Sequence, residues 1–256
     1  MGKVTPKGVL LQHAQNYIRA VMADRLREEG FVSKDGEDVY WYRVVNGDVI
    51  HSVSFITRHT SIPMWMQIGI GFHPLFITPE FPNSPYIYAM PASEVMSDGN
   101  YIVKESNNAV FSENAKTICP HDALHGRDIL EGAMSVFEMA QTPRQCYEIH
   151  KERKLDVLEY GSLLTMSSAF VDEVIYWDDR ELYPFCGRYI EKEITVCEDL
   201  LSKGRKLPRS YVRNYQNLLA AKPAIFESRR EDYLEVLRSR IPETARLLKK
   251  HTGIEL

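Results

Sequence analysis

The sequence predicts an α+β protein, with an N-terminal helix on an antiparallel β-meander followed by a helical C-terminal half. Three observations predict this fold: apolar residues at helical spacing near the N-terminus, an Asn46-Gly47 dipeptide between two β-rich runs, and helical patterns throughout the second half. We therefore expect a helix and a sheet in residues 1–120 and a helical region in residues 121–256. Because each part needs the other to bury its apolar surface, we expect one cooperative unit.

The first predicted element is a helix over residues 7–29. Its apolar side chains share one side of the helix and are Leu10, Ala14, Tyr17, Ile18, Val21 and Leu26. Gly30 is expected to end the helix, because glycine readily adopts the positive φ found just past a helix end. Phe31 is then expected to fold back onto the last turn.

Three strands are expected next, over residues 39–45, 49–57 and 64–72. The first two are rich in β-branched and aromatic residues, and Asn46-Gly47 between them favours a tight hairpin turn. The third strand alternates between an apolar face and a second face. The apolar face carries Met64, Met66, Ile68, Ile70 and Phe72, and we expect the N-terminal helix to cover it.

Helical patterns fill the rest of the chain. We expect helices at about residues 121–141, 143–156, 162–178, 181–203, 208–220 and 229–251. Thr142-Pro143 favours the start of the second of these, because proline suits the first position of a helix. No repeat of fixed period is present, which argues against a helical solenoid.

Several short motifs in the first 75 residues follow a recognisable order. In chain order they are Leu26, Gly30-Phe31, Tyr42-Arg43, Val53-x-Phe55 and Ile68-Gly69. With these motifs the region resembles an uncharacterised bacterial domain-of-unknown-function family that has a leucine-x3-glycine-phenylalanine signature and an antiparallel sheet. The resemblance implies a bacterial domain of this fold. It implies no catalytic residue, since no activity is established for that family.

Composition is typical of globular proteins. Of the 256 residues, 44% are hydrophobic and 26% are charged, which argues against a largely disordered chain. The four cysteines form no C-x-x-C pair, as expected for a reduced protein of the cytoplasm. The most apolar stretch, residues 64–72, is about half the length needed to span a bilayer. We therefore expect a cytoplasmic protein without a membrane partner.

Charge is unevenly distributed along the chain. Residues 1–200 carry a net charge of −11 and residues 201–256 carry +7. We expect the acidic body and the basic tail to pack together. A natural counterpart to the tail is the acidic stretch formed by Asp172, Glu173, Asp178, Asp179 and Glu181. For the acids themselves, a solvated helix face is the favoured interpretation.

The densest group of possible metal ligands lies between Cys119 and His125. His121 and His125 are four residues apart, so on a helix both imidazoles point to one side, a spacing that suits zinc. However, Asp122 stands where the zinc-protease motif needs glutamate, and no third ligand is evident. A solvated first helical turn is favoured over a metal site, and we expect no cofactor.

The second face of the predicted sheet is the favoured place for a ligand. It carries Trp65, Gln67, Gly69 and Gly71, and Tyr40 and Tyr42 are expected to join it from the hairpin. Glycines within a strand often allow close approach of a ligand or backbone, and tryptophan beside glutamine offers an apolar wall with a polar group. The favoured interpretation of this face, however, is that the C-terminal helices cover it and bury Trp65.

These observations favour a non-enzymatic cytoplasmic binding protein for a protein or small ligand. The main reason is that nucleotide-binding, P-loop and serine-hydrolase motifs are missing from the sequence. One alternative is a metal-dependent hydrolase that uses His121 and His125. The other is a nucleic-acid binder that uses the basic and aromatic residues between 205 and 215, although the same pattern suits an amphipathic helix with Tyr211 and Tyr215 packed inward.

Overall fold

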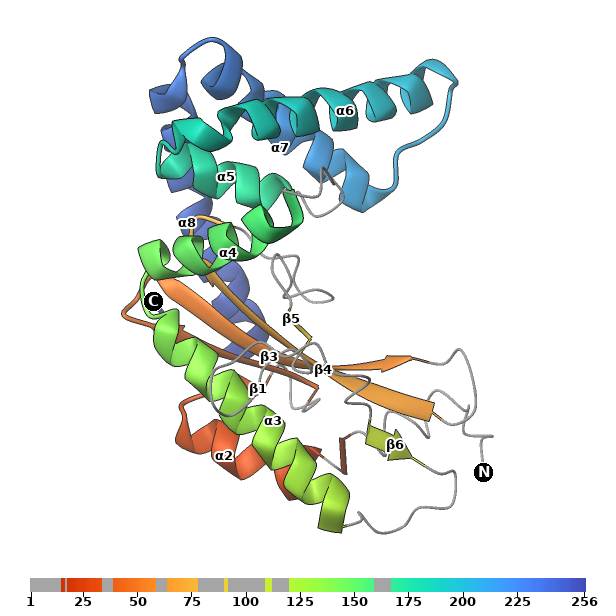
Figure 1. The fold of residues 1–256 in the computed structure, drawn as a ribbon, viewed down its shortest axis with the longest axis vertical. Coiled ribbons are helices and arrows are strands. Elements are labelled where there is room, and N and C mark those ends of the chain that lie inside the picture. The colour runs from red at the N-terminus through yellow and green to blue at the C-terminus, as the bar shows by residue number, and fades with distance from the viewer. Residues whose placement is uncertain are drawn as a thin grey trace. The chain divides into compact units, whose positions relative to one another are not determined.

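The computed structural model describes residues 15–16, 18–33, 39–58, 64–77, 90–91, 109–111, 120–158 and 167–256. The chain divides into two compact units (Figure 1). We call them the sheet unit, which comprises Met1–Leu75, Pro79–Cys146 and Ala245–Leu256, and the helical unit, which comprises Phe76–Thr78 and Tyr147–Thr244. The change of pattern in the sequence predicts a boundary near residue 120. The units divide elsewhere, because the first long helix and the C-terminal residues belong with the sheet.

The N-terminal helix is interrupted at Met22, where φ is −124°. Helical residues 18–21 precede this point, and α2 (Ala23–Glu28) follows it. Residues 7–14 and 17 of the predicted helix lie outside the described residues. The helix ends as predicted: Gly30 has a φ of 79°, and the Phe31 amide donates to the Leu26 carbonyl at 2.9 Å.

This ending is a Schellman cap, which joins the residue after the glycine to the last turn of the helix. The Gly30 amide donates to Arg27 in the second hydrogen bond of the motif. The side chains of Leu26 and Phe31, which the cap brings together, are both buried. The cap gives the leucine-x3-glycine-phenylalanine pattern a physical basis in this chain.

The described strands form one antiparallel sheet. They are β1 (Val32–Ser33), β2 (Tyr40–Val45), β3 (Val49–Arg58), β4 (Met64–Pro74), β5 (Met90–Pro91) and β6 (Ala109–Phe111). The order is β1-β2-β3-β4-β5, and β6 also pairs with β4. At the β2–β3 turn, φ is 52° for Asn46 and 76° for Gly47, and the two strands pair from Val45↔Val49 onward. The predicted hairpin is therefore confirmed, and with it the α+β fold.

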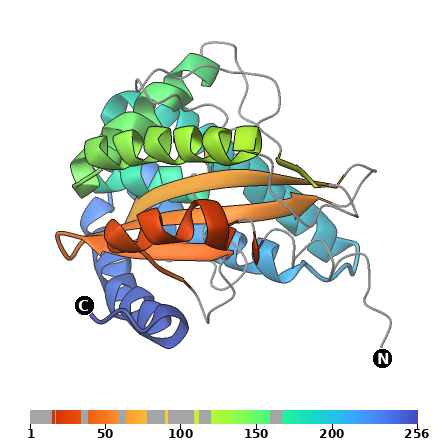
Figure 2. The ribbon, with the colours of Figure 1, turned by 90° about the horizontal axis from the view of Figure 1, so that it is seen from below.

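Both faces of the sheet are covered within the sheet unit (Figures 1 and 2). On one face, His51 of β3 stacks on Phe137 of α3 (Pro120–Met139), with ring centroids 4.5 Å apart. On the other face, Tyr42 and Ile50 pack with Leu248 near the end of α8 (Arg230–Thr252). The sheet lies between α3 and the end of α8, although the two helices are separated by about a hundred residues of chain.

The helical unit is built around α5 (Ser168–Tyr176), in which every residue from 169 to 175 is buried. The other elements are most of α4 (Pro143–Leu158), a 3-10 helix (Arg180–Leu182), α6 (Tyr183–Ser202), α7 (Arg209–Phe226) and the first part of α8. The prediction ended α7 at residue 220, ahead of Pro223. The helix continues because Ala221 and Ala224 are buried, and this packing offsets the hydrogen bond that proline lacks. In the described part of the chain, no helix combines the length and apolarity needed to cross a membrane.

Candidate functional site

Two of the sequence-predicted ligand-binding residues, Tyr40 and Tyr42, lie on the same face of β2. Tyr42 is buried in a cluster with Ile50, Leu75 and Leu248, and Tyr40 packs against this cluster. The two tyrosines therefore contribute to the core between the sheet and the end of α8.

For the other sequence-predicted residues, the structure describes the backbone alone. Trp65 and Gln67 occupy β4, and His121 and His125 occupy the first turns of α3. Their side chains lie outside the described part of the chain. Among the residues that are described, no group of three or more histidine, cysteine or acidic side chains is arranged to hold a metal ion.

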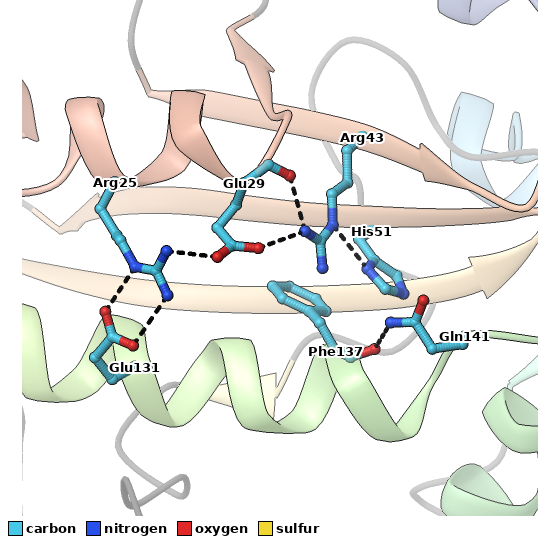
Figure 3. Close-up of polar contacts among 7 residues, drawn as sticks. All are labelled: Arg25, Glu29, Arg43, His51, Glu131, Phe137 and Gln141. Carbon is cyan, nitrogen blue, oxygen red and sulfur yellow. Dashed lines mark hydrogen bonds and ion pairs between the residues drawn. The ribbon is translucent and has the colours of Figure 1, made fainter.

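A chain of charged side chains runs from the surface of the sheet unit toward its core (Figure 3). Glu131 of α3 pairs with Arg25 of α2, Arg25 pairs with Glu29, and Glu29 pairs with Arg43 of β2 at 3.0 Å. The exposed fraction falls from 50% at the Glu131 side chain to 14% at Arg43. Alternating charges neutralise one another along this path, which lowers the cost of burying Arg43.

His51 ends this chain in the core. Arg43 Nε donates to His51 Nδ1 at 3.2 Å, and His51 Nε2 lies 2.7 Å from the carbonyl oxygen of Ala140. Because arginine only donates, Nδ1 accepts and Nε2 carries the proton. Burial, together with the charge of Arg43, lowers the pKa of His51 to about 3. With both nitrogens engaged, the ring joins β2, β3 and the end of α3 and is poorly placed to act as a general base.

Asp172 and Glu173 of α5 are buried, which corrects the expectation of a solvated helix face for these two acids, whereas Asp178 and Glu181 are exposed as expected. Asp172 accepts a hydrogen bond from Tyr233 at 2.7 Å and forms an ion pair with Arg240, both on α8. Burial raises the pKa of Asp172, and the Arg240 guanidinium offsets part of this rise. The related expectation, that the acidic stretch is the counterpart of the basic tail, is confirmed for this pair.

Three further polar contacts join α4 to the α5 region. His150 Nδ1 lies 3.0 Å from the carboxylate of Glu173, and both side chains are buried. The Tyr147 hydroxyl and the Lys151 ammonium each donate to Asp179 Oδ2 at 2.6 Å. Burial favours the neutral acid, but these two hydrogen bonds lower the pKa of Asp179. The sequence feature that pointed to this polar core is the acidic stretch. The order of its residues does not show whether their side chains are buried.

The exposed surface of α7 carries a row of apolar side chains that sequence reasoning missed. Val212, Leu219 and Phe226 follow one another at seven-residue spacing and are 38%, 41% and 48% exposed. Residues seven apart share one side of a helix, so the three form a stripe, which the half-buried Tyr215 joins. We call these four residues the α7 stripe. Tyr211, which the amphipathic interpretation placed inward, is 43% exposed.

Basic residues accompany the α7 stripe. Residues 200–226 contain six lysines and arginines and no acidic residue. Arg205 and Lys206 are exposed, and Arg213 is half-buried. An acid-free run of 27 residues in a chain of net charge −4 is visible in the sequence and could have identified this segment.

Phe226 is held in place by a close approach of α7 to α6. A Cβ atom at Gly187 of α6 would lie 3.0 Å from the Phe226 ring, so the glycine makes room for one edge of this phenylalanine. The remaining part of the ring belongs to the exposed stripe.

Comparisons with models of protein families, with curated proteins and with solved structures find no match to this chain.

Proposed function

We propose that the chain is a non-enzymatic binding protein of the cytoplasm and that a protein partner docks on the α7 stripe. The observation that carries this proposal is the exposure of Val212, Leu219 and Phe226 on one side of one helix. Exposed apolar residues that are scattered singly are ordinary, whereas several on one side of one helix favour an interaction surface.

The buried polar groups support a binding role rather than a catalytic one. His51, Asp172 and Asp179 each use their polar atoms to join elements of the fold. A small-ligand site at Tyr42 is disfavoured, because this side chain is in the core with Leu248. The Schellman cap and the meander support the further proposal that the sheet unit is related to the family with the leucine-x3-glycine-phenylalanine signature.

Site-specific photo-crosslinking tests the function. A photoreactive amino acid is introduced at position 219 of the full chain, in cells that make the protein naturally. A matched control carries it at Val32, which is 42% exposed and belongs to the sheet unit. We expect one discrete protein adduct from position 219 and none of that mass from position 32.

The captured partner is then purified and its binding is measured directly. Leu219→Asp should weaken this binding by about tenfold or more, since a carboxylate replaces a desolvated apolar contact. The proposal fails if positions 219 and 32 give the same adducts, or if the purified partner binds the Leu219→Asp variant as tightly as the wild type.

A further inference from the structure

We infer that the partner segment is an acidic amphipathic helix that lies along the α7 stripe. This inference rests on the proposed function and adds the chemistry and the shape of the partner. It is argued from the spacing of the stripe, from the charges around it and from the occupant that these charges disfavour.

The spacing of the stripe fits a helix. Val212, Tyr215, Leu219 and Phe226 stand at relative positions 0, 3, 7 and 14, which are core positions of a heptad pattern, and the remaining core position, 10, holds the exposed Lys222. A heptad row on one helix packs against a similar row on another, with side chains of each fitting between those of its partner. α7 has 18 residues, so its partner helix would be about 18 residues long.

The surrounding charge fits an acidic partner. The six basic residues between 200 and 226 have no acidic residue among them. The acids that reach this segment come from α6: Asp199 pairs with Lys203, and Glu198 accepts a hydrogen bond from the Tyr215 hydroxyl. Acidic side chains that flank an apolar row would meet Arg213 and its basic neighbours, which favours encounter and fixes the orientation of the two helices.

The same charges disfavour a second copy of the chain as the occupant. A second copy that placed α7 against α7 would bring two acid-free basic segments together, and like charges repel. Nucleic acids and anionic membranes carry the same sign of charge as the inferred partner, and the spacing of the stripe favours a helix over both.

Binding of labelled synthetic peptides to the full chain tests the inference. The first peptide is a heptad helix about as long as α7, with leucine at its core positions and glutamate around them. The second replaces every glutamate by lysine, and the third replaces every leucine by serine. We expect the first peptide to bind at least about tenfold more tightly than either control, and its affinity to fall as salt is raised.

Variants of the protein locate the binding. Leu219→Asp and Arg213→Glu should each weaken binding of the first peptide by about tenfold, whereas Arg246→Glu, on an exposed residue of the sheet unit, should leave it unchanged. The same titrations use a single-stranded RNA and vesicles that contain phosphatidylserine as competing ligands. Sedimentation of the wild type and of Leu219→Asp reports whether copies of the chain associate.

Several outcomes would overturn the inference: equal binding of the glutamate and lysine peptides, failure of the first peptide to bind, tighter binding of RNA or vesicles, or a dimer that Leu219→Asp dissociates. If the photo-crosslinked partner contacts position 219 through a segment that is neither helical nor acidic, the inference fails while the proposed function stands. If position 219 yields no specific adduct, the proposed function fails as well.

Discussion

At the scale of single residues, buried ionisable side chains in the described part of the chain lie beside polar partners. Asp172 is paired with Arg240, Glu173 faces His150, and Arg43 is paired with Glu29. Removal of one partner leaves the other without compensation in a medium that solvates it poorly, so these residues should be sensitive to substitution.

The low pKa of His51 makes the stability of the sheet unit depend on pH. The folded pKa is about 3, below the usual value of 6.5, so the unfolded chain binds a proton that the folded chain excludes. The contribution of His51 is therefore fully present above about pH 6.5 and is lost as pH falls from there toward 3. The slope is at most about 1.4 kcal/mol per pH unit, or about 2 kcal/mol between pH 6.5 and 5.

Denaturant unfolding at pH 7 and at pH 5 measures this loss. A His51→Asn variant should lose less stability between the two pH values than the wild type, because it lacks the titrating ring, while the other histidines contribute equally to both proteins. Nitrogen chemical shifts should show the His51 proton on Nε2 at pH 5. Identical pH dependence in the two proteins would contradict the proposed environment of His51.

The Asp172–Arg240 pair gives a second residue-scale prediction. Arg240→Met leaves the buried Asp172 carboxylate without its cation and should cost about 3–5 kcal/mol of unfolding free energy. The double variant with Asp172→Leu should cost clearly less than the sum of the two single variants, since it leaves no unpaired charge. Thermal melts of the four proteins measure the coupling, and strictly additive losses would show that the two side chains do not interact.

At the scale of elements, the ends of the helices and the hairpin turn are held by backbone conformations that few residues adopt. Gly30 and Gly47 both have positive φ, as does Asn46. The space around Gly47 is open, so the requirement for glycine there is conformational and does not come from packing.

Gly47→Val should destabilise the protein by more than about 1 kcal/mol, because a β-branched side chain strongly resists positive φ. The matched control is Asn46→Gly, which keeps the turn permissive and should be tolerated. Thermal denaturation measures both. An unchanged melting temperature for Gly47→Val would mean that the turn is not the one described.

At the scale of the whole molecule, the chain leaves the sheet unit after Cys146 and returns to it at Ala245. The last residues therefore complete a core whose strands were made some two hundred residues earlier. The expectation that the two halves fold as one cooperative unit stays a prediction. The path of the chain makes it specific, because the core of the sheet unit needs the residues that follow the helical unit.

Leu248→Ala should cost about 2–5 kcal/mol, the usual range for a buried leucine, because it opens a cavity against Tyr42 and Ile50. Leu256→Ala, at a residue that is 53% exposed, is the control and should change little.

A fragment ending at residue 120 lacks both Phe137 and Leu248 and should aggregate. A soluble, monomeric and cooperatively folded fragment would contradict the dependence of the sheet on its C-terminal residues.

The sequence by itself determined the local features of this protein. The Asn46-Gly47 turn, the helix end at Gly30 and the strands that follow are set by the φ values and side-chain alternation of a few consecutive residues. Such signals are short-range, so they can be recognised without a structure. The apolar face of the third strand was predicted for the same reason.

Only the tertiary structure decided which residues meet across the chain. The burial of Asp172 depends on Arg240, 68 residues away, and the burial of Tyr42 depends on Leu248. The boundary of the two units and the exposure of the α7 stripe likewise follow from which helices pack together. An acid or an apolar row has the same sequence pattern whether a partner covers it or not, because burial is a property of long-range packing and not of local spacing.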